Sequence, residues 1–119
     1  MWRKIEKLIN EDSIEISTTY TSKKIDWSKY SKLYIKLGAS DLRYAKVYFM
    51  ISQNVTIPDW WTPSNDSNLV SFYKEYVAPI WSAGTVLEFD ISQVTNTGIF
   101  MIATMDNVGD LYISDIWIE

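Results

Sequence analysis

Polar and apolar residues alternate with a period of two over most of this chain from Ile14 onward. The clearest example is the segment 32–37, in which the apolar positions are Leu33, Ile35 and Leu37. Successive side chains of a β-strand point to opposite faces, so this pattern predicts a half-buried strand. The residues on the opposite, outward face are then Lys32, Tyr34 and Lys36. We therefore predict an all-β chain.

Three further segments are predicted to be strands. Residues 85–91 alternate, with an inward face that consists of Leu87, Phe89 and Ile91. Residues 99–105 are apolar almost throughout, a pattern typical of a central strand that is covered on both faces. Residues 111–118 also alternate, with an inward face that consists of Tyr112, Ser114, Ile116 and Ile118. Asp115 and Trp117 are then expected to face outward.

Turn-forming residues separate these segments at short intervals. Gly, Asn, Asp and Ser are concentrated at 38–41, 82–84, 96–98 and 106–110, and all four are favoured in turns. Short strands divided by frequent turns are typical of sandwiches and jelly rolls. We predict a two-layer antiparallel β-sandwich with jelly-roll topology.

The length of 119 residues fits one domain with one hydrophobic core. We predict a single β-sandwich domain over residues 14–119 and an N-terminal arm or first element over residues 1–13. In the arm, Trp2, Ile5 and Ile9 have the spacing of one face of a short helix, although a first strand fits the segment as well. No stretch is long and apolar enough to predict a membrane span.

Composition excludes several classes of function. The chain has no His and no Cys, so it cannot build Ser-His-Asp or Cys-His catalytic systems, and zinc, haem and iron–sulfur sites are not expected. The net charge is -4, and Arg3 and Arg43 are the only arginines, which argues against nucleic-acid binding. We predict no cofactor, no metal and no enzymatic activity.

Aromatic residues are the unusual part of the composition, with six Trp and eight Tyr. Trp60 and Trp61 lie in a long polar connection, where they are predicted to form a stacking platform for a sugar ring. The amide and carboxylate groups expected to bond the sugar hydroxyls are those of Asn65, Asp66 and Asn68. The alternative is that one of the two indoles folds back and covers the open end of the sandwich.

The strand predicted over residues 44–53 presents a second aromatic surface. Its outward face consists of Tyr44, Lys46, Tyr48 and Met50. Such a face serves either as a ligand cleft or as a packing surface for another subunit. We count Tyr44 and Tyr48 among the candidate ligand-binding residues.

Glu88 and Asp90 lie two residues apart on the outward face of the segment 85–91, roughly 7 Å from each other along the strand. This separation overlaps that of the paired carboxylates of glycosidases. Alternation alone, however, places charged residues at these two positions. We therefore predict ordinary surface charges and rank a minimal glycosidase-like enzyme last among three functional hypotheses.

Three segments resemble a known family. Residues 25–36, which read IDWSKYSKLYIK, look like an early segment of carbohydrate-binding modules and other galactose-binding-like jelly rolls. Residues 86–92 and 109–118 resemble the late strands of the same family. Compact jelly rolls that are rich in Lys, Asn, Ile and Tyr and free of Cys also look like accessory proteins of bacteriophage virions, in tails, baseplates and head fibres.

The resemblance has one consequence for metal binding. In this family an acidic residue of the last strand helps to hold a structural calcium, and Ser114 occupies that position here. A serine does not supply the anionic ligand, and Asp115 approaches the site only if a bulge shifts the register. We expect no bound calcium.

The resemblance implies a non-enzymatic module that acts as a virion structural or adhesion component through aromatic surface contacts. Its expected partners are other virion or assembly subunits, including copies of itself in a homo-oligomer, and its expected location is the virion. The segment 1–11 is the element expected to dock onto a larger assembly. The alternative is a carbohydrate-binding module that grips a cell-surface glycan with Trp60 and Trp61.

Overall fold

The chain forms a sandwich of two β-sheets in a computed structural model, which describes residues 3–4, 14–16, 19–40, 45–58, 60–78, 84–105 and 111–119. The strands are β1 (Arg3–Lys4), β2 (Ile14–Ile16), β3 (Thr19–Asp26), β4 (Lys32–Ser40), β5 (Ala45–Ser52), β6 (Val70–Ala78), β7 (Val86–Asp90), β8 (Thr97–Met105) and β9 (Leu111–Ile118). The helical structure in the described part of the chain is one 3-10 turn, η1 (Trp27–Lys29).

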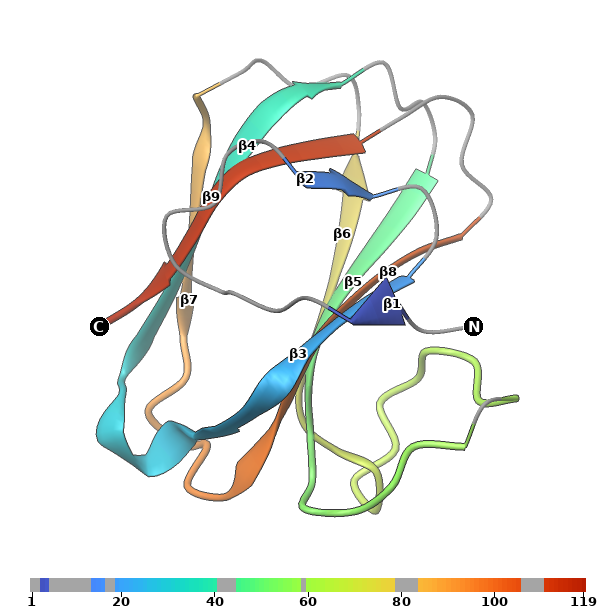
Figure 1. Ribbon diagram of the computed structural model, residues 1–119, viewed down its shortest axis with the longest axis vertical. Coiled ribbons are helices and arrows are strands. Elements are labelled where there is room, and N and C mark those ends of the chain that lie inside the picture. Colours follow the sequence, from blue (N-terminus) through green and yellow to red (C-terminus); the bar gives the residue numbers. More distant parts are fainter. Residues whose placement is uncertain are drawn as a thin grey trace.

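The strand order is that of a jelly roll. The five-stranded sheet has the order β1-β3-β8-β5-β6, and the four-stranded sheet has the order β2-β9-β4-β7. Neighbouring strands are antiparallel except β1 and β3, which run parallel. From β3 to β9 the chain crosses to the other sheet at every step except β5 to β6 (Figure 1). The predicted fold class, a two-layer sandwich of this topology, is confirmed.

The core lies between the two sheets and follows the predicted alternation. Leu33, Ile35 and Leu37 of β4 have no exposed surface. Phe89 of β7 is buried, and its ring lies 5.3 Å from that of Phe49 in the opposite sheet. The alternation of apolar and polar residues therefore predicts the inward face of these strands correctly, because the other sheet covers this face.

The last strand departs from simple alternation. Lys36 of β4 pairs with Asp115, but the next residue, Leu37, pairs with Ile113, so Ser114 is an extra residue in β9. Its hydroxyl donates a hydrogen bond to the Lys36 carbonyl oxygen at 3.2 Å. Because of this bulge Ile113 and Ile116, three positions apart, are both fully buried. The prediction that Ser114 belongs to the inward face is wrong for this reason.

A loop packs on part of the outer face of the five-stranded sheet. Residues 53–69 connect β5 to β6 and leave the sandwich at one end, as the green and yellow trace in Figure 1 shows. A second buried cluster lies between this loop and the sheet, and it consists of Tyr48, Met50, Trp61, Val70, Met101 and Ala103. The central strand β8 is thus covered on both faces, as its sequence predicts, but the second cover is the loop.

The N-terminal segment is described in part. Arg3 and Lys4 form a short strand that pairs with Tyr20 and Thr21 of β3, so a first strand is present at these positions. The stripe of Trp2, Ile5 and Ile9 lies outside the described residues. Within the described part of the chain, no helix has the length and apolar character needed to cross a membrane.

Candidate functional site

The loop between β5 and β6 is fixed at both ends by hydrogen bonds. The Gln53 backbone N–H donates to the Leu69 carbonyl at 2.8 Å, and the Gln53 side-chain amide donates to the Ser67 carbonyl at 3.3 Å. The Asp66 carboxylate accepts from the Asn68 backbone N–H at 2.9 Å, and the Asp66 carbonyl accepts from the N–H groups of Leu69 and Val70. Asp66 therefore forms the turn that returns the chain to β6.

The two adjacent tryptophans of this loop lie in opposite environments. Trp61 is 8% exposed and belongs to the cluster on the outer sheet face, whereas Trp60 is 80% exposed. The Trp61 backbone N–H donates to the Pro58 carbonyl at 3.0 Å, which fixes the backbone beside the exposed ring. One indole thus folds back onto the sandwich, and the other is presented to solvent.

The other candidate residues divide in the same way. Asn65 and Asn68 are exposed on the loop that carries Trp60, and Asp66 is half-buried in its turn. Tyr48 is 7% exposed beneath the loop, with its ring 5.8 Å from that of Tyr73, which differs from the open sheet face that we expected. Tyr44 lies outside the described residues. The loop thus carries five of the seven predicted ligand-binding residues, of which Trp61 is buried, and Tyr48 lies outside it on β5.

The outer face of the four-stranded sheet carries an aromatic pair that we did not select as a site. Tyr34 of β4 pairs in register with Trp117 of β9, and their rings stack at 5.2 Å with an interplanar angle of 14°. Partial burial raises the pKa of Tyr34, and the nearby carboxylates of Glu119 and Glu88 add to the shift. Alternation places both rings outward, but the register between β4 and β9 is needed to bring them together.

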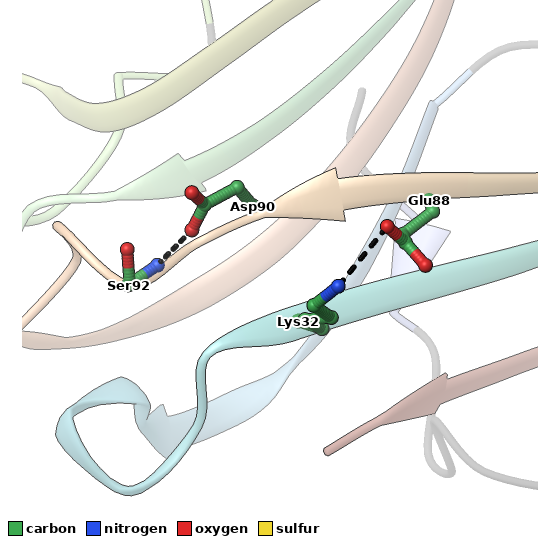
Figure 2. Close-up of polar contacts among 4 residues, drawn as sticks. All are labelled: Lys32, Glu88, Asp90 and Ser92. Carbon is green, nitrogen blue, oxygen red and sulfur yellow. Dashed lines mark hydrogen bonds and ion pairs between the residues drawn. The ribbon is translucent and has the colours of Figure 1, made fainter.

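The two carboxylates of β7 each have a partner of their own (Figure 2). Glu88 forms an ion pair with the Lys32 ammonium at 3.2 Å across the β4–β7 ladder, which raises the pKa of Lys32. The Asp90 carboxylate accepts a hydrogen bond from the Ser92 backbone N–H at 2.9 Å. Both side chains are exposed, as the alternation predicts. Glu88 and Asp90 are therefore surface charges, and each carboxylate contacts a different partner.

The Asp90 turn gives a pH-dependent prediction. Hydrogen bonds from the Ser92 hydroxyl and backbone N–H hold the pKa of Asp90 below its ordinary value of 3.8. A group with a lowered folded-state pKa stabilises the fold above its unfolded pKa, and this contribution is lost as the pH falls through the folded value. We expect Ser92→Ala to move the pKa of Asp90 upward, toward 3.8, in an NMR titration of the side-chain carboxyl carbons.

Asp26 provides the matched control for this titration. Its carboxylate accepts hydrogen bonds from the Ser28 hydroxyl at 2.6 Å and the Ser28 backbone N–H at 3.2 Å, and its pKa is lowered for the same reason. Ser28→Ala should therefore raise the pKa of Asp26 and leave that of Asp90 unchanged. An unchanged Asp90 titration in Ser92→Ala would contradict the assignment of the shift to the hydroxyl.

The residues at the bulge do not fit a calcium site. The Ser114 hydroxyl donates to the Lys36 carbonyl, and Asp115 pairs with Lys36, a cation, in the regular part of the β4–β9 ladder. No cluster of three or more His, Cys, Asp or Glu side chains occurs within the described ranges. The register shift lies at Ser114 and changes the pairing of the residues before it, so Asp115 stays opposite a lysine.

Comparison with known proteins assigns no family to the chain. No protein-family model matches it, and no curated protein sequence is significantly similar to it.

Proposed function

We propose that this chain is a non-enzymatic jelly-roll module that binds a partner through the exposed indole of Trp60, and that it serves as a structural or adhesion component of a virion. The supporting observation is the contrast between Trp61, which is 8% exposed, and its neighbour Trp60, which is 80% exposed. Burying a large aromatic side chain is worth about 1.5–3 kcal/mol. Because Trp60 is exposed in the free chain, the free energy of burying its indole is gained only when a partner covers the ring.

The loop holds the exposed ring ready for binding. Hydrogen bonds at Gln53 and Asp66 close the base of the loop, and the buried Trp61 fixes its middle on the sheet. A preformed loop loses less conformational entropy when it binds, so more of the contact energy is available as affinity. Tryptophan is also among the residues that contribute most to protein interfaces. These features support a contact surface.

The virion setting rests on the resemblance of the sequence to accessory jelly rolls of bacteriophages. Such an assembly component is expected to meet copies of itself or other virion subunits. The charged side chains described above have surface partners or form turns, which is compatible with a binding role and suggests no chemistry. Location on the virion is part of the same proposal.

A carbohydrate-binding module is the second candidate, because the exposed indole shares its loop with polar side chains. Asn65 and Asn68 are exposed on the same loop as Trp60. An indole packs on the apolar face of a sugar ring, and amides exchange hydrogen bonds with its hydroxyls. In this reading the partner of the loop is a cell-surface glycan.

Trp60→Ala tests the proposed contact. We expect the purified wild-type chain to form a homo-oligomer in sedimentation experiments, and we expect Trp60→Ala to weaken this assembly by at least about tenfold, the equivalent of about 1.4 kcal/mol. The change should leave the free energy of unfolding within about 0.5 kcal/mol, because the ring is exposed. Trp61→Ala is unsuitable as a test because it opens a gap in the outer cluster.

The outcome also separates the two candidates. Trp60→Phe is the control, because it keeps an aromatic face and should retain most of the binding. If the wild-type chain is monomeric and its signal on a glycan array disappears in Trp60→Ala, sugar binding is favoured over assembly as the role of this residue. A monomer without glycan binding would contradict both self-assembly and sugar binding through Trp60. Binding that Trp60→Ala leaves unchanged would contradict the Trp60 contact with any partner.

A further inference from the structure

A hollow of about 350 Å³ opens on the outer face of the five-stranded sheet, where β3 and β8 meet the first residues of the loop after β5. This volume lies at the lower end of the range for small-molecule sites. The hollow is lined by residues other than the candidate residues of the Trp60 loop, and it has both an apolar floor and a polar rim. It is therefore a separate candidate for ligand binding.

The floor of the hollow is apolar. Ile99 and Met101, which are alternate residues of β8, lie on the side of the sheet that faces the hollow, and Met101 is fully buried. Ile57 and Val55 approach from the loop, where Val55 is 48% exposed. A floor of this kind provides a surface for the C–H face of a ring.

A bulge in β3 brings a charged side chain, that of Lys24, to the hollow. Thr21 pairs with Met101 and Lys24 pairs with Ile99, so three residues of β3 advance against two of β8. Without that shift Thr21 and Lys24 would point to opposite faces, whereas both line the hollow. The bulge is held by the buried Ser22, whose hydroxyl accepts from the Phe100 backbone N–H at 2.8 Å and donates to the Lys23 carbonyl at 2.7 Å.

The Lys24 ammonium is held above the apolar floor. It donates a hydrogen bond to the side-chain oxygen of Asn54 at 3.5 Å, which ties β3 to the loop across the hollow. An ammonium has three N–H donors, so this bond leaves donors for a ligand. Thr21 and Thr56 add hydroxyls to the lining. Among the described residues that line the hollow, Lys24 is the one charged group, although the whole chain carries a net charge of -4.

We propose that this hollow binds an acidic sugar residue, a hydroxylated ring that carries one carboxylate. The carboxylate pairs with Lys24, the C–H face of the ring packs on Ile99 and Ile57, and the hydroxyls bond with Asn54 and the threonines. Each of the three parts of the lining, cation, apolar floor and polar rim, then meets its chemical counterpart. The proposal goes beyond the Trp60 contact and does not depend on it.

An NMR titration of the full chain tests the proposal, with the backbone amides of Lys24, Asn54 and Ile99 as reporters. The probes are D-glucuronate and N-acetylneuraminate, with D-glucose as the neutral ring and acetate and inorganic phosphate as anions without the ring. We expect saturable shifts with one or both sugar acids. Glucose, acetate and phosphate should each bind at least about tenfold more weakly, a difference of about 1.4 kcal/mol.

Variants of Lys24 separate charge from shape. Lys24→Gln should weaken sugar-acid binding by about tenfold and Lys24→Arg should retain it, because one charge-assisted hydrogen bond is at stake. Lys29→Gln, a matched loss of an exposed lysine that does not line the hollow, should have no effect. Added salt should weaken the binding, since the cation is exposed.

Three results would overturn the proposal. Equal affinity for phosphate, acetate and sugar acid would reduce the hollow to a simple anion contact, and equal affinity for glucose would remove the role of Lys24. The absence of saturable shifts with both sugar acids would exclude the site. Trp60→Ala should leave the titration unchanged, so the fate of this proposal is distinguishable from that of the Trp60 contact.

Discussion

Trp27→Ala is expected to lower the free energy of unfolding by about 4 kcal/mol, within the range measured for the loss of large aromatic side chains from protein cores. Trp27 has no exposed surface, and its ring meets that of Phe100 edge-on at 6.4 Å. The indole N–H donates to the Gly98 carbonyl at 3.0 Å. The substitution therefore removes packing and leaves a buried carbonyl without this donor. Urea unfolding followed by fluorescence or circular dichroism measures the loss.

Trp27→Phe separates the two contributions. It keeps most of the apolar volume and removes the N–H donor, so we expect a smaller loss of about 1–3 kcal/mol. A loss below about 1 kcal/mol for Trp27→Ala would contradict the tight packing of this ring in the core, because well-packed sites do not tolerate such a truncation.

Gly98→Ala is expected to destabilise the fold by about 3 kcal/mol, at the upper end of the usual cost of overpacking. A Cβ atom at this position would meet the backbone carbonyl oxygen of Ser52 at a separation that real Cβ atoms do not adopt. Backbone cannot move aside as a flexible side chain can. The same carbonyl accepts a hydrogen bond from the Asn96 amide at 2.9 Å, and the Ser52 hydroxyl accepts from the Ile99 N–H, so a shift of Ser52 disturbs both contacts.

Gly84→Ala is the control for steric crowding. Gly84 has φ of 91°, a conformation that favours glycine, but none of the described residues lies within 4 Å of a Cβ built there. We expect a loss of about 1–2 kcal/mol from backbone strain alone. Thermal unfolding of the two variants side by side checks the order. A Gly98→Ala variant at least as stable as Gly84→Ala would contradict this prediction, because it would show that the Ser52 backbone shifts at little cost.

The sequence predicts strands well where one face is buried by the other sheet. Leu33, Ile35 and Leu37 alternate with polar residues because β4 lies between β9 and β7 with one face on the core. The near-continuous apolar run of β8 likewise reports burial on both faces. In β4 the period of two follows from one face on the core and one face toward water. In β8 the loss of this period follows from burial on both faces, so the local pattern agrees with the fold in both strands.

Features that depend on register or on a distant segment could not be predicted. The extra residue at Ser114 reverses the face of the residues before it, and nothing in the local sequence marks that bulge. The pattern around Tyr48 predicts an outward face correctly, but the cover comes from a loop whose path the pattern does not specify. Likewise, Tyr34 and Trp117 are 83 positions apart, and only the pairing of β4 with β9 stacks their rings.

The candidate site was predictable in composition but not in geometry. The polar, proline-bounded connection with Trp60 and Trp61 is visible in the sequence. The sequence fits an exposed indole and an indole folded back onto the sandwich equally well. Burial of Trp61 depends on its packing with Val70 of β6 and Met101 of β8, which the sequence of the loop does not specify. The sequence does not indicate the hollow beside Lys24, because the lysine reaches that face only through the bulge in β3.

The loop over the outer sheet face limits how this protein can diversify. Its Trp61 belongs to the same buried cluster as Tyr48, Met50 and Met101, so a shorter loop would leave these side chains of β5 and β8 open to water. An exposed apolar patch of that kind favours aggregation. Deletion of the loop is therefore expected to be selected against even where binding is dispensable. New specificities should arise by point substitution at its exposed positions, while its length stays constant.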